Sequence, residues 1–141
     1  MASFFYDSFW NDLFSAAVAP EADTVYMMLT TSSYSPNKST NAKRSDVTNE
    51  SSGAGYSTGG QAVTVTITNA SSGTSDLLTV GLADVSWTVA TITAAYAVVY
   101  KHRGGASSAD NLYCLVDFGG SFASVAGTFT VHMSTQFGIQ N

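Results

Sequence analysis

The sequence holds one strong nucleophile, Cys114, and two histidines that could activate it, His102 and His132. A thiol beside an imidazole, with a carboxylate such as Asp117 orienting the ring, is the arrangement of nucleophilic catalysis. Cys114 stands inside an apolar stretch, however, where a small buried thiol is common and unreactive. We therefore expect no catalytic residue. A small hydrolase that uses Cys114 and a histidine is kept as a third hypothesis, after the two given at the end of this subsection.

Metal and cofactor chemistry would need clustered ligands or a phosphate-binding loop. The sequence has no H-x-H, C-x-x-C, H-E-x-x-H or calcium-loop spacing, and its ten carboxylates are scattered singly. The Gly53-Ala54-Gly55 stretch is not followed by a helical pattern, as a phosphate-binding loop must be. Folding could still bring two carboxylates together for glycoside hydrolysis, but scattered acids are equally typical of a solvated surface. We expect no metal and no cofactor.

The chain of 141 residues is long enough for one domain, residues 1–141, with a core of its own. Only 11% of its residues are charged, while 20 are serine and 17 are threonine, a composition that favours strands over helices. Ten acidic residues against five basic ones give a net charge of −5, which makes nucleic acid an unexpected partner. A single cysteine excludes an intramolecular disulfide.

No uninterrupted apolar stretch reaches the length of a membrane span, and Asp7, Asn11 and Asp12 interrupt the apolar N-terminal run. We therefore expect no membrane association and no signal peptide. A chain of this kind is made and kept in a soluble, reducing compartment.

The elements that must position any site are one helix and about seven strands. Large side chains recur at helical spacing from residue 3 to about residue 17, which predicts an N-terminal helix within residues 1–20, with Ser3 as its N-cap. Val25, Met27 and Leu29 alternate with other residues in the first strand and should share one face. The predicted strands are 24–31, 62–68, 77–82, 85–88, 91–100, 112–118 and 128–133. This series predicts a mainly β fold, an antiparallel β-sandwich or jelly-roll-like domain spanning residues 24–133.

Polar segments separate these strands. The longest is the loop at 32–60; those at 101–111 and 119–127 should project from the sheet ends, and 134–141 should be a tail. Tyr34 and Tyr56 lie in the long loop among Ser, Asn and Gly, a composition typical of exposed protein-contact surfaces. These two rings, or Trp87, could also stack on a sugar.

Several phrases of the sequence resemble a family of small virion structural proteins of tailed bacteriophages. They are LTTSSYSPN at 29–37, RSDVTNE at 44–50, SGAGYSTGG at 52–60, DVSW at 84–87, the apolar run 92–100 and LVDFG at 115–119. The resemblance spans roughly residues 4–133 and lapses at 62–79 and 121–126. It implies a place on the virus particle, as a capsid decoration or cement protein with no enzymatic activity.

We therefore expect a cement protein that stabilises the shell of the major capsid protein, made in the host cytoplasm and located on the capsid surface of the virion. It should assemble as a homo-oligomer, a dimer or trimer. A tail-associated or surface module that binds a receptor or glycan is the alternative. The candidate interface residues are Phe9, Trp10, Leu13, Phe14, Tyr34, Lys38, Lys43, Arg44 and Tyr56.

Overall fold

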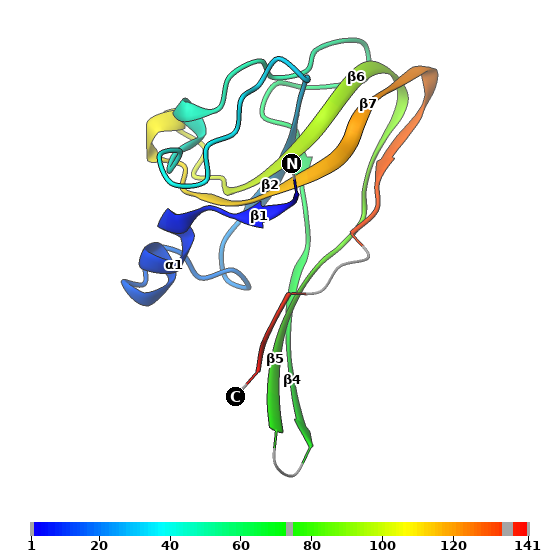
Figure 1. Cartoon of the computed structure of the whole chain (residues 1–141). Helices are drawn as coiled ribbons and strands as arrows, with labels where there is room; N and C mark the ends of the chain where they lie inside the picture. Colours follow the sequence, from blue (N-terminus) through cyan, green and yellow to red (C-terminus); the bar gives the residue numbers. More distant parts are fainter. Residues whose placement is uncertain (1, 73–74, 134–136, 141) are drawn as a thin grey trace.

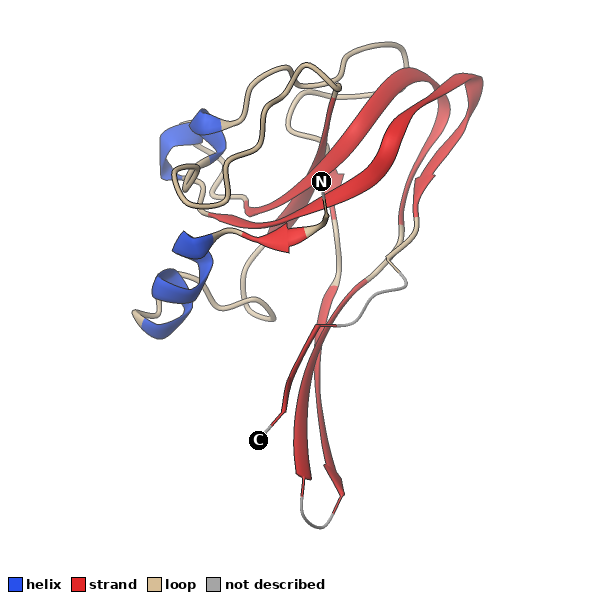
Figure 2. Cartoon of the chain, in the orientation of Figure 1, coloured by secondary structure: helices blue, strands red, loops and turns tan. Residues whose placement is uncertain are grey.

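The structure is a computed structural model that describes residues 2–72, 75–133 and 137–140. The predicted mainly β fold with one α-helix near the N-terminus is confirmed, and every strand pair is antiparallel. Figure 2 shows strands forming most of the molecule, with the α-helix at one side.

The strands form two sheets. The larger sheet has the order β1 (Phe4–Phe5), β7 (Leu112–Val131), β6 (Val85–Lys101), β2 (Val25–Thr30) and β3 (Gln61–Ala62). The smaller has the order β4 (Val65–Ser72), β5 (Ser75–Leu82) and β8 (Phe137–Gln140). Figure 1 shows the larger sheet in a rounded body and the smaller one extending away from it as a narrow projection. We call these two parts the body and the arm.

Strands β6 and β7 make a ribbon of 17 and 20 residues that runs through the whole body. The predicted strands 85–88 and 91–100 are both parts of β6, and the predicted strands 112–118 and 128–133 both fall largely within β7. Because β7 also includes residues 119–127, the predicted loop there is wrong. The ladder continues through that segment by way of several register shifts. Val89 and Ala126 take positive φ angles of 50° and 47° there, and such irregularities bend a ribbon and hide its alternation from sequence analysis.

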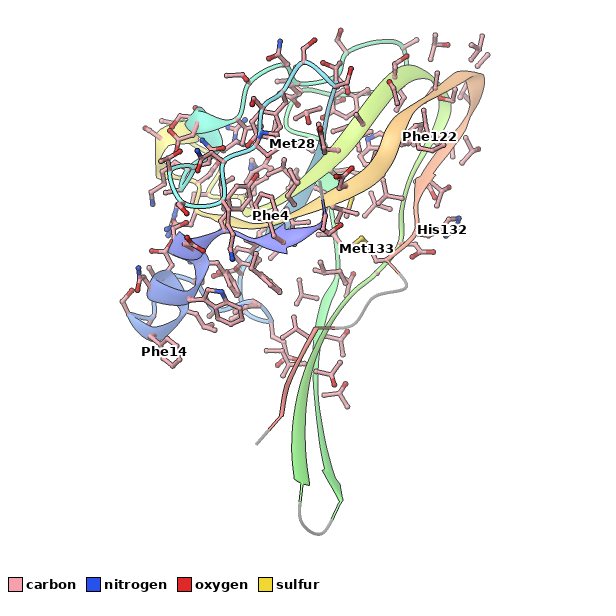
Figure 3. The ribbon with its side chains drawn as sticks, viewed as in Figure 1. Phe4, Phe14, Met28, Phe122, His132 and Met133 are labelled. Atoms are coloured by element: carbon pink, nitrogen blue, oxygen red, sulfur yellow. The ribbon has the colours of Figure 1, made fainter. Side chains whose placement is uncertain are left out.

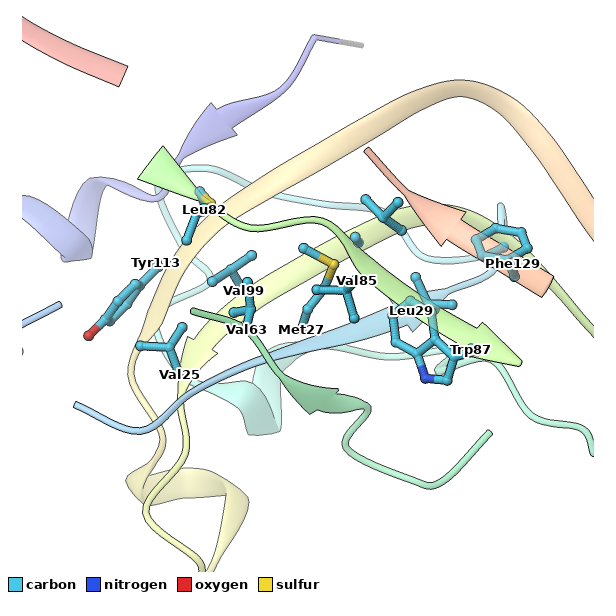
Figure 4. Close-up of a cluster of buried hydrophobic side chains, with 14 of the residues drawn as sticks. Val25, Met27, Leu29, Val63, Leu82, Val85, Trp87, Val99, Tyr113 and Phe129 are labelled. Carbon is cyan, nitrogen blue, oxygen red and sulfur yellow. The ribbon is translucent and has the colours of Figure 1, made fainter. Parts of the chain in front are cut away.

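The body buries apolar side chains on both faces of the larger sheet. Val25, Met27 and Leu29 lie in one cluster and Met28 in the other, so the alternation predicted for the first strand is confirmed. Figure 4 shows Leu29, Trp87 and Phe129 gathered in the first cluster. The part of the ribbon that holds Trp87 and Phe129 therefore packs over the middle of the larger sheet. The layering of a sandwich or jelly roll stays a prediction.

The N-terminal segment begins as a strand, and the predicted helix over residues 3–17 is too long. Phe4 and Phe5 pair with Leu115 and Cys114, and the helix α1 covers only Asp7–Phe14. Tyr6 takes the N-cap position in place of Ser3, whose hydroxyl instead accepts a hydrogen bond from the backbone N–H of Asp117 at 2.9 Å. Pairing with a distant strand outweighs the local helical pattern here.

The remaining segments differ from expectation in detail. The predicted strand 62–68 is split between β3 and β4, yet Val63 is buried while the neighbouring Ala62 and Thr64 are exposed, as the alternation predicts. The predicted tail contains β8, which pairs with β5, so that prediction is wrong for 137–140. Residues 134–136 and 141 of the predicted tail lie outside the described residues.

Candidate interaction surfaces

The residues predicted to carry nucleophilic chemistry lie in different surroundings. Cys114 is 1% exposed, and burial raises the pKa of its thiol to about 12, so it stays protonated and unreactive at neutral pH. His102 stacks on Tyr26 with ring centroids 4.1 Å apart. His132 lies on the surface with its Nδ1 2.8 Å from a carboxylate oxygen of Asp84. The thiol therefore has the properties of a core side chain.

The helix packs mainly on the core of its own chain. Phe9 is buried between Phe5 and Tyr113, with ring centroids 4.9 and 5.0 Å away. Trp10 and Leu13 are partly buried against the same core cluster. Phe14 differs from these three because it is 87% exposed, and Figure 3 shows it at the far end of the helix, pointing away from the body. Of the four helix residues predicted to make contacts, Phe14 is the one whose side chain is largely exposed.

Substitution separates these two roles. Phe9→Ala is expected to lower the free energy of unfolding by about 3–5 kcal/mol, because it leaves a cavity among packed rings. Phe14→Ala should change that free energy by less than about 0.5 kcal/mol, because its ring is already in water. Urea unfolding followed by tryptophan fluorescence measures both values. Equal losses in the two variants would contradict this placement of the helix.

The two loop tyrosines are structural, so the prediction that they are exposed is wrong. Tyr34 is 3% exposed; its hydroxyl lies 3.1 Å from that of Tyr6 and donates to Asn41 Oδ1 at 2.9 Å. The Tyr56 hydroxyl accepts from the backbone N–H of Leu29 at 3.0 Å and donates to Glu50 at 2.8 Å. Burial raises the pKa of Tyr56. These contacts fix the long loop against the sheet.

Trp87, the other ring predicted to stack on a sugar, is 4% exposed and belongs to the core. None of the three predicted rings therefore forms an open platform for a glycan.

The three basic residues of the long loop are held to different degrees. Arg44 Nε lies 2.8 Å from Asp110 Oδ2, a carboxylate with no exposed side-chain surface. The backbone N–H of Lys43 donates to Asp46 at 2.9 Å, and the side chain of Lys38 reaches Asp7 at 3.5 Å on the open surface. Arg44 is thus part of the framework, and Lys38 is the cation of this loop that a partner can most readily reach.

Three large apolar side chains are exposed at the bend of the β6–β7 ribbon, and two of them belong to the segment 119–127 that the sequence predicted as a polar loop. Val89, Phe122 and Val125 are 72%, 55% and 82% exposed, and Figure 3 shows Phe122 near the top of the bend. We call these three residues the bend patch. Register shifts of the ladder lie on both sides of the stretch that pairs Phe122 with Ala94.

Beside the bend patch lies an open hollow of about 510 Å³. It lies along β7, between its first half at Val116–Phe118 and its last residues, and Phe118, Phe122 and Phe129 contribute rings to it. Asp117 and His132 supply its ionisable groups, and serine and threonine hydroxyls complete the lining. A hollow of this size and mixed character can hold part of a chain or a small polar ligand.

Among the described residues, no group of three or more His, Cys, Asp or Glu side chains is placed to hold a metal ion. In the same part of the chain, no helix has the length and apolar character needed to cross a membrane. Comparisons with protein-family models, with curated proteins and with solved structures found no match to this chain.

Proposed function

We propose that this chain is a structural protein of a tailed-bacteriophage virion, and specifically a decoration or cement protein bound to the major capsid protein on the capsid surface. Its role is to stabilise the shell by burying contact surface at joints between capsid subunits. It acts as a homo-oligomer, so that each particle gains many symmetric and individually modest contacts.

The observation that carries this proposal is the position of the exposed apolar side chains. Phe14 is exposed at the end of the helix, and the bend patch is exposed at the bend of the ribbon. The body between them has buried clusters on both faces of the larger sheet. Large apolar side chains on protruding edges of a packed body are typical of surfaces that bind other proteins. The sequence resemblance described above supplies the class of assembly.

The direct test is the number of copies per purified virus particle, measured from a stained gel against the major capsid protein. Several hundred copies are expected for a shell component, because capsid sites repeat with the symmetry of the shell. About a dozen copies would assign the chain to the tail and overturn the capsid proposal. Its absence from particles would overturn the virion proposal altogether.

The bend patch can be tested in the same particles. A chain carrying Phe122→Ser and Val125→Ser is expected to lose about ten-fold or more in occupancy, because an apolar contact is replaced by hydroxyls. Thr88→Ser, next to Val89 and also exposed, is the matched control and should bind normally. Full occupancy of the double variant would exclude the bend patch as the contact surface.

A tail-associated module that binds glycans is the second candidate, and the hollow beside the bend patch favours it. Rings such as Phe118 and Phe122 line it and offer stacking surface, and serine and threonine hydroxyls in the same lining can bond to sugar hydroxyls. Binding on a glycan array that is lost with Phe122→Ser would support this function. In the alternative as first stated, Trp87 and the loop tyrosines would carry the contact, and the burial of Trp87 and Tyr34 argues against that version.

A further inference from the structure

One edge of β7 is largely unpaired. On one side β7 pairs with β6, and on the other side β1 pairs only with Cys114 and Leu115. Beyond Leu115, none of the strands in the described residues pairs with this outer edge. An unpaired edge presents a row of backbone N–H and C=O groups, which are complementary to the backbone of another extended segment.

The pairing with β1 stops where the hollow begins. Ser3 precedes β1, and its side-chain hydroxyl, instead of a backbone carbonyl, accepts the backbone N–H of Asp117 at 2.9 Å. Ser3 and Asp117 both line the hollow, together with Val116 and Phe118. The unpaired edge therefore leads directly into the hollow, and a strand added to that edge would lie beside it.

The hollow supplies apolar contact for a side chain of such a strand. Phe118, Phe122 and Phe129 line its volume of about 510 Å³. Phe129 is 8% exposed and anchored in the core, whereas Phe122 is 55% exposed. Where a sheet edge recruits an extended segment, backbone hydrogen bonds supply affinity and pockets for alternate side chains supply specificity. An apolar side chain in the hollow would also remove part of the Phe122 ring from water.

The distribution of charge favours a basic segment. All five lysine and arginine residues lie in the stretches 38–44 and 101–103. These stretches meet at Asp110, which accepts the backbone N–H groups of Arg44 and Arg103, each at 2.9 Å. Figure 1 shows the cyan and yellow segments of this end on one side of the body and the orange bend of β7 on the other. None of the described residues that line the hollow is a lysine or arginine, so in a chain with ten acidic residues this side attracts cations.

We propose that the outer edge of β7 and the hollow form a docking site for an extended, basic segment of another protein. The backbone of that segment adds a strand to β7 beyond Leu115, and one of its apolar side chains packs on the rings of the hollow. Its lysine or arginine side chains face the acidic surface around the hollow. This deepens the proposed function by naming the kind of capsid segment that the chain binds, and it rests on that function only for the identity of the partner.

The probe is a synthetic peptide of about eight residues, within the usual length of a strand, in which lysine alternates with valine or phenylalanine. Titrated into the full-length chain and followed by calorimetry, it is expected to bind. A version with N-methyl groups on alternate backbone amides should bind about ten-fold more weakly or worse, because it keeps every side chain but cannot donate the hydrogen bonds of a strand. Replacing its lysines with glutamate should also weaken binding by about ten-fold or more.

A pair of variants locates the binding site. Phe122→Ser should raise the dissociation constant of the lysine peptide by about ten-fold, because a ring of the hollow is lost. Phe14→Ser removes an exposed ring from the helix, which does not line the hollow, and should change that constant by less than about two-fold. Amide hydrogen exchange gives a second readout, since the bound peptide should slow exchange within residues 116–124 and leave α1 unchanged.

Three results would overturn the inference. They are no binding of the lysine peptide, equal affinity of its N-methylated version, and equal effects of the two phenylalanine variants. Glycan binding that depends on Phe122, without peptide binding, would overturn it too and would assign the hollow to the second candidate function. None of these measurements uses virus particles, so the docking site and the virion proposal can fail separately.

Discussion

Replacing Gly60 with alanine is expected to lower the free energy of unfolding by about 3–5 kcal/mol, one of the largest losses available from a single added methyl group. Gly60 has a φ of +77°, and a Cβ atom built on it would stand 1.8 Å from the backbone oxygen of Met27. That oxygen belongs to β2 in the centre of the body, so neither atom can move without breaking the pairing of Met27 with Gln61. Gly60 therefore fixes where the long loop returns to the sheet.

Gly104 is a matched control for this prediction. Its φ of +76° is nearly the same, yet a Cβ atom there would meet nothing within 4 Å. Gly104→Ala should therefore cost only the backbone strain of a left-handed alanine, about 1–2 kcal/mol. Urea unfolding of both variants measures the difference, which isolates the clash with β2. Equal losses would mean that the long loop is not seated on β2 as described.

The parts of the fold that could be predicted from the sequence are those with a regular period and local partners. The sequence predicts that Val25, Met27 and Leu29 share one face, because alternate residues of a strand point to the same side of a sheet. In the structure these three lie in one buried cluster and Met28 lies in the other. The helix was found for the same reason, since Phe9 and Leu13 lie one turn apart and both contact the core.

The errors arise where distant pairing decides the structure. Phe4 and Phe5 fit a helical stripe, but as a strand they gain hydrogen bonds to Leu115 and Cys114, more than a hundred residues away in the chain. The segment 119–127 has the glycines and small polar residues of a loop, yet β6 supplies a long partner strand that draws it into the ribbon. No local signal encodes either partner.

The candidate site shows the same division. The composition of the long loop predicts contacts with other proteins, but composition alone does not say whether a residue makes its contacts within the chain or outside it. Tyr34 and Arg44 turn inward because Tyr6 and Asp110 supply partners from other segments. Phe14 and Lys38 lack comparable burial and stay on the surface. Exposure, which decides between these roles, depends on the whole fold.

The ion pair between Arg44 and Asp110 should be among the strongest polar contributions to stability. Asp110→Ala is expected to lower the free energy of unfolding by about 3 kcal/mol, because it leaves the partly buried guanidinium without its carboxylate. The Asp110 carboxylate also accepts the backbone N–H of Arg103 at 2.9 Å. One carboxylate therefore joins the long loop to the segment between β6 and β7.

Asp7→Ala provides the contrast, since Asp7 pairs with Lys38 at 3.5 Å with about half of each side chain exposed. Its loss should cost less than about 1 kcal/mol, because water screens the pair. Thermal or urea unfolding of the two variants tests this order, and a larger loss for Asp7→Ala would reverse the assignment of framework and surface. If the order holds, an Arg44 variant that fails to bind capsids reports a weakened body and cannot be taken as evidence for a contact. A Lys38 variant should leave the body intact, so under the proposed function its effect on capsid binding tests the surface of the long loop.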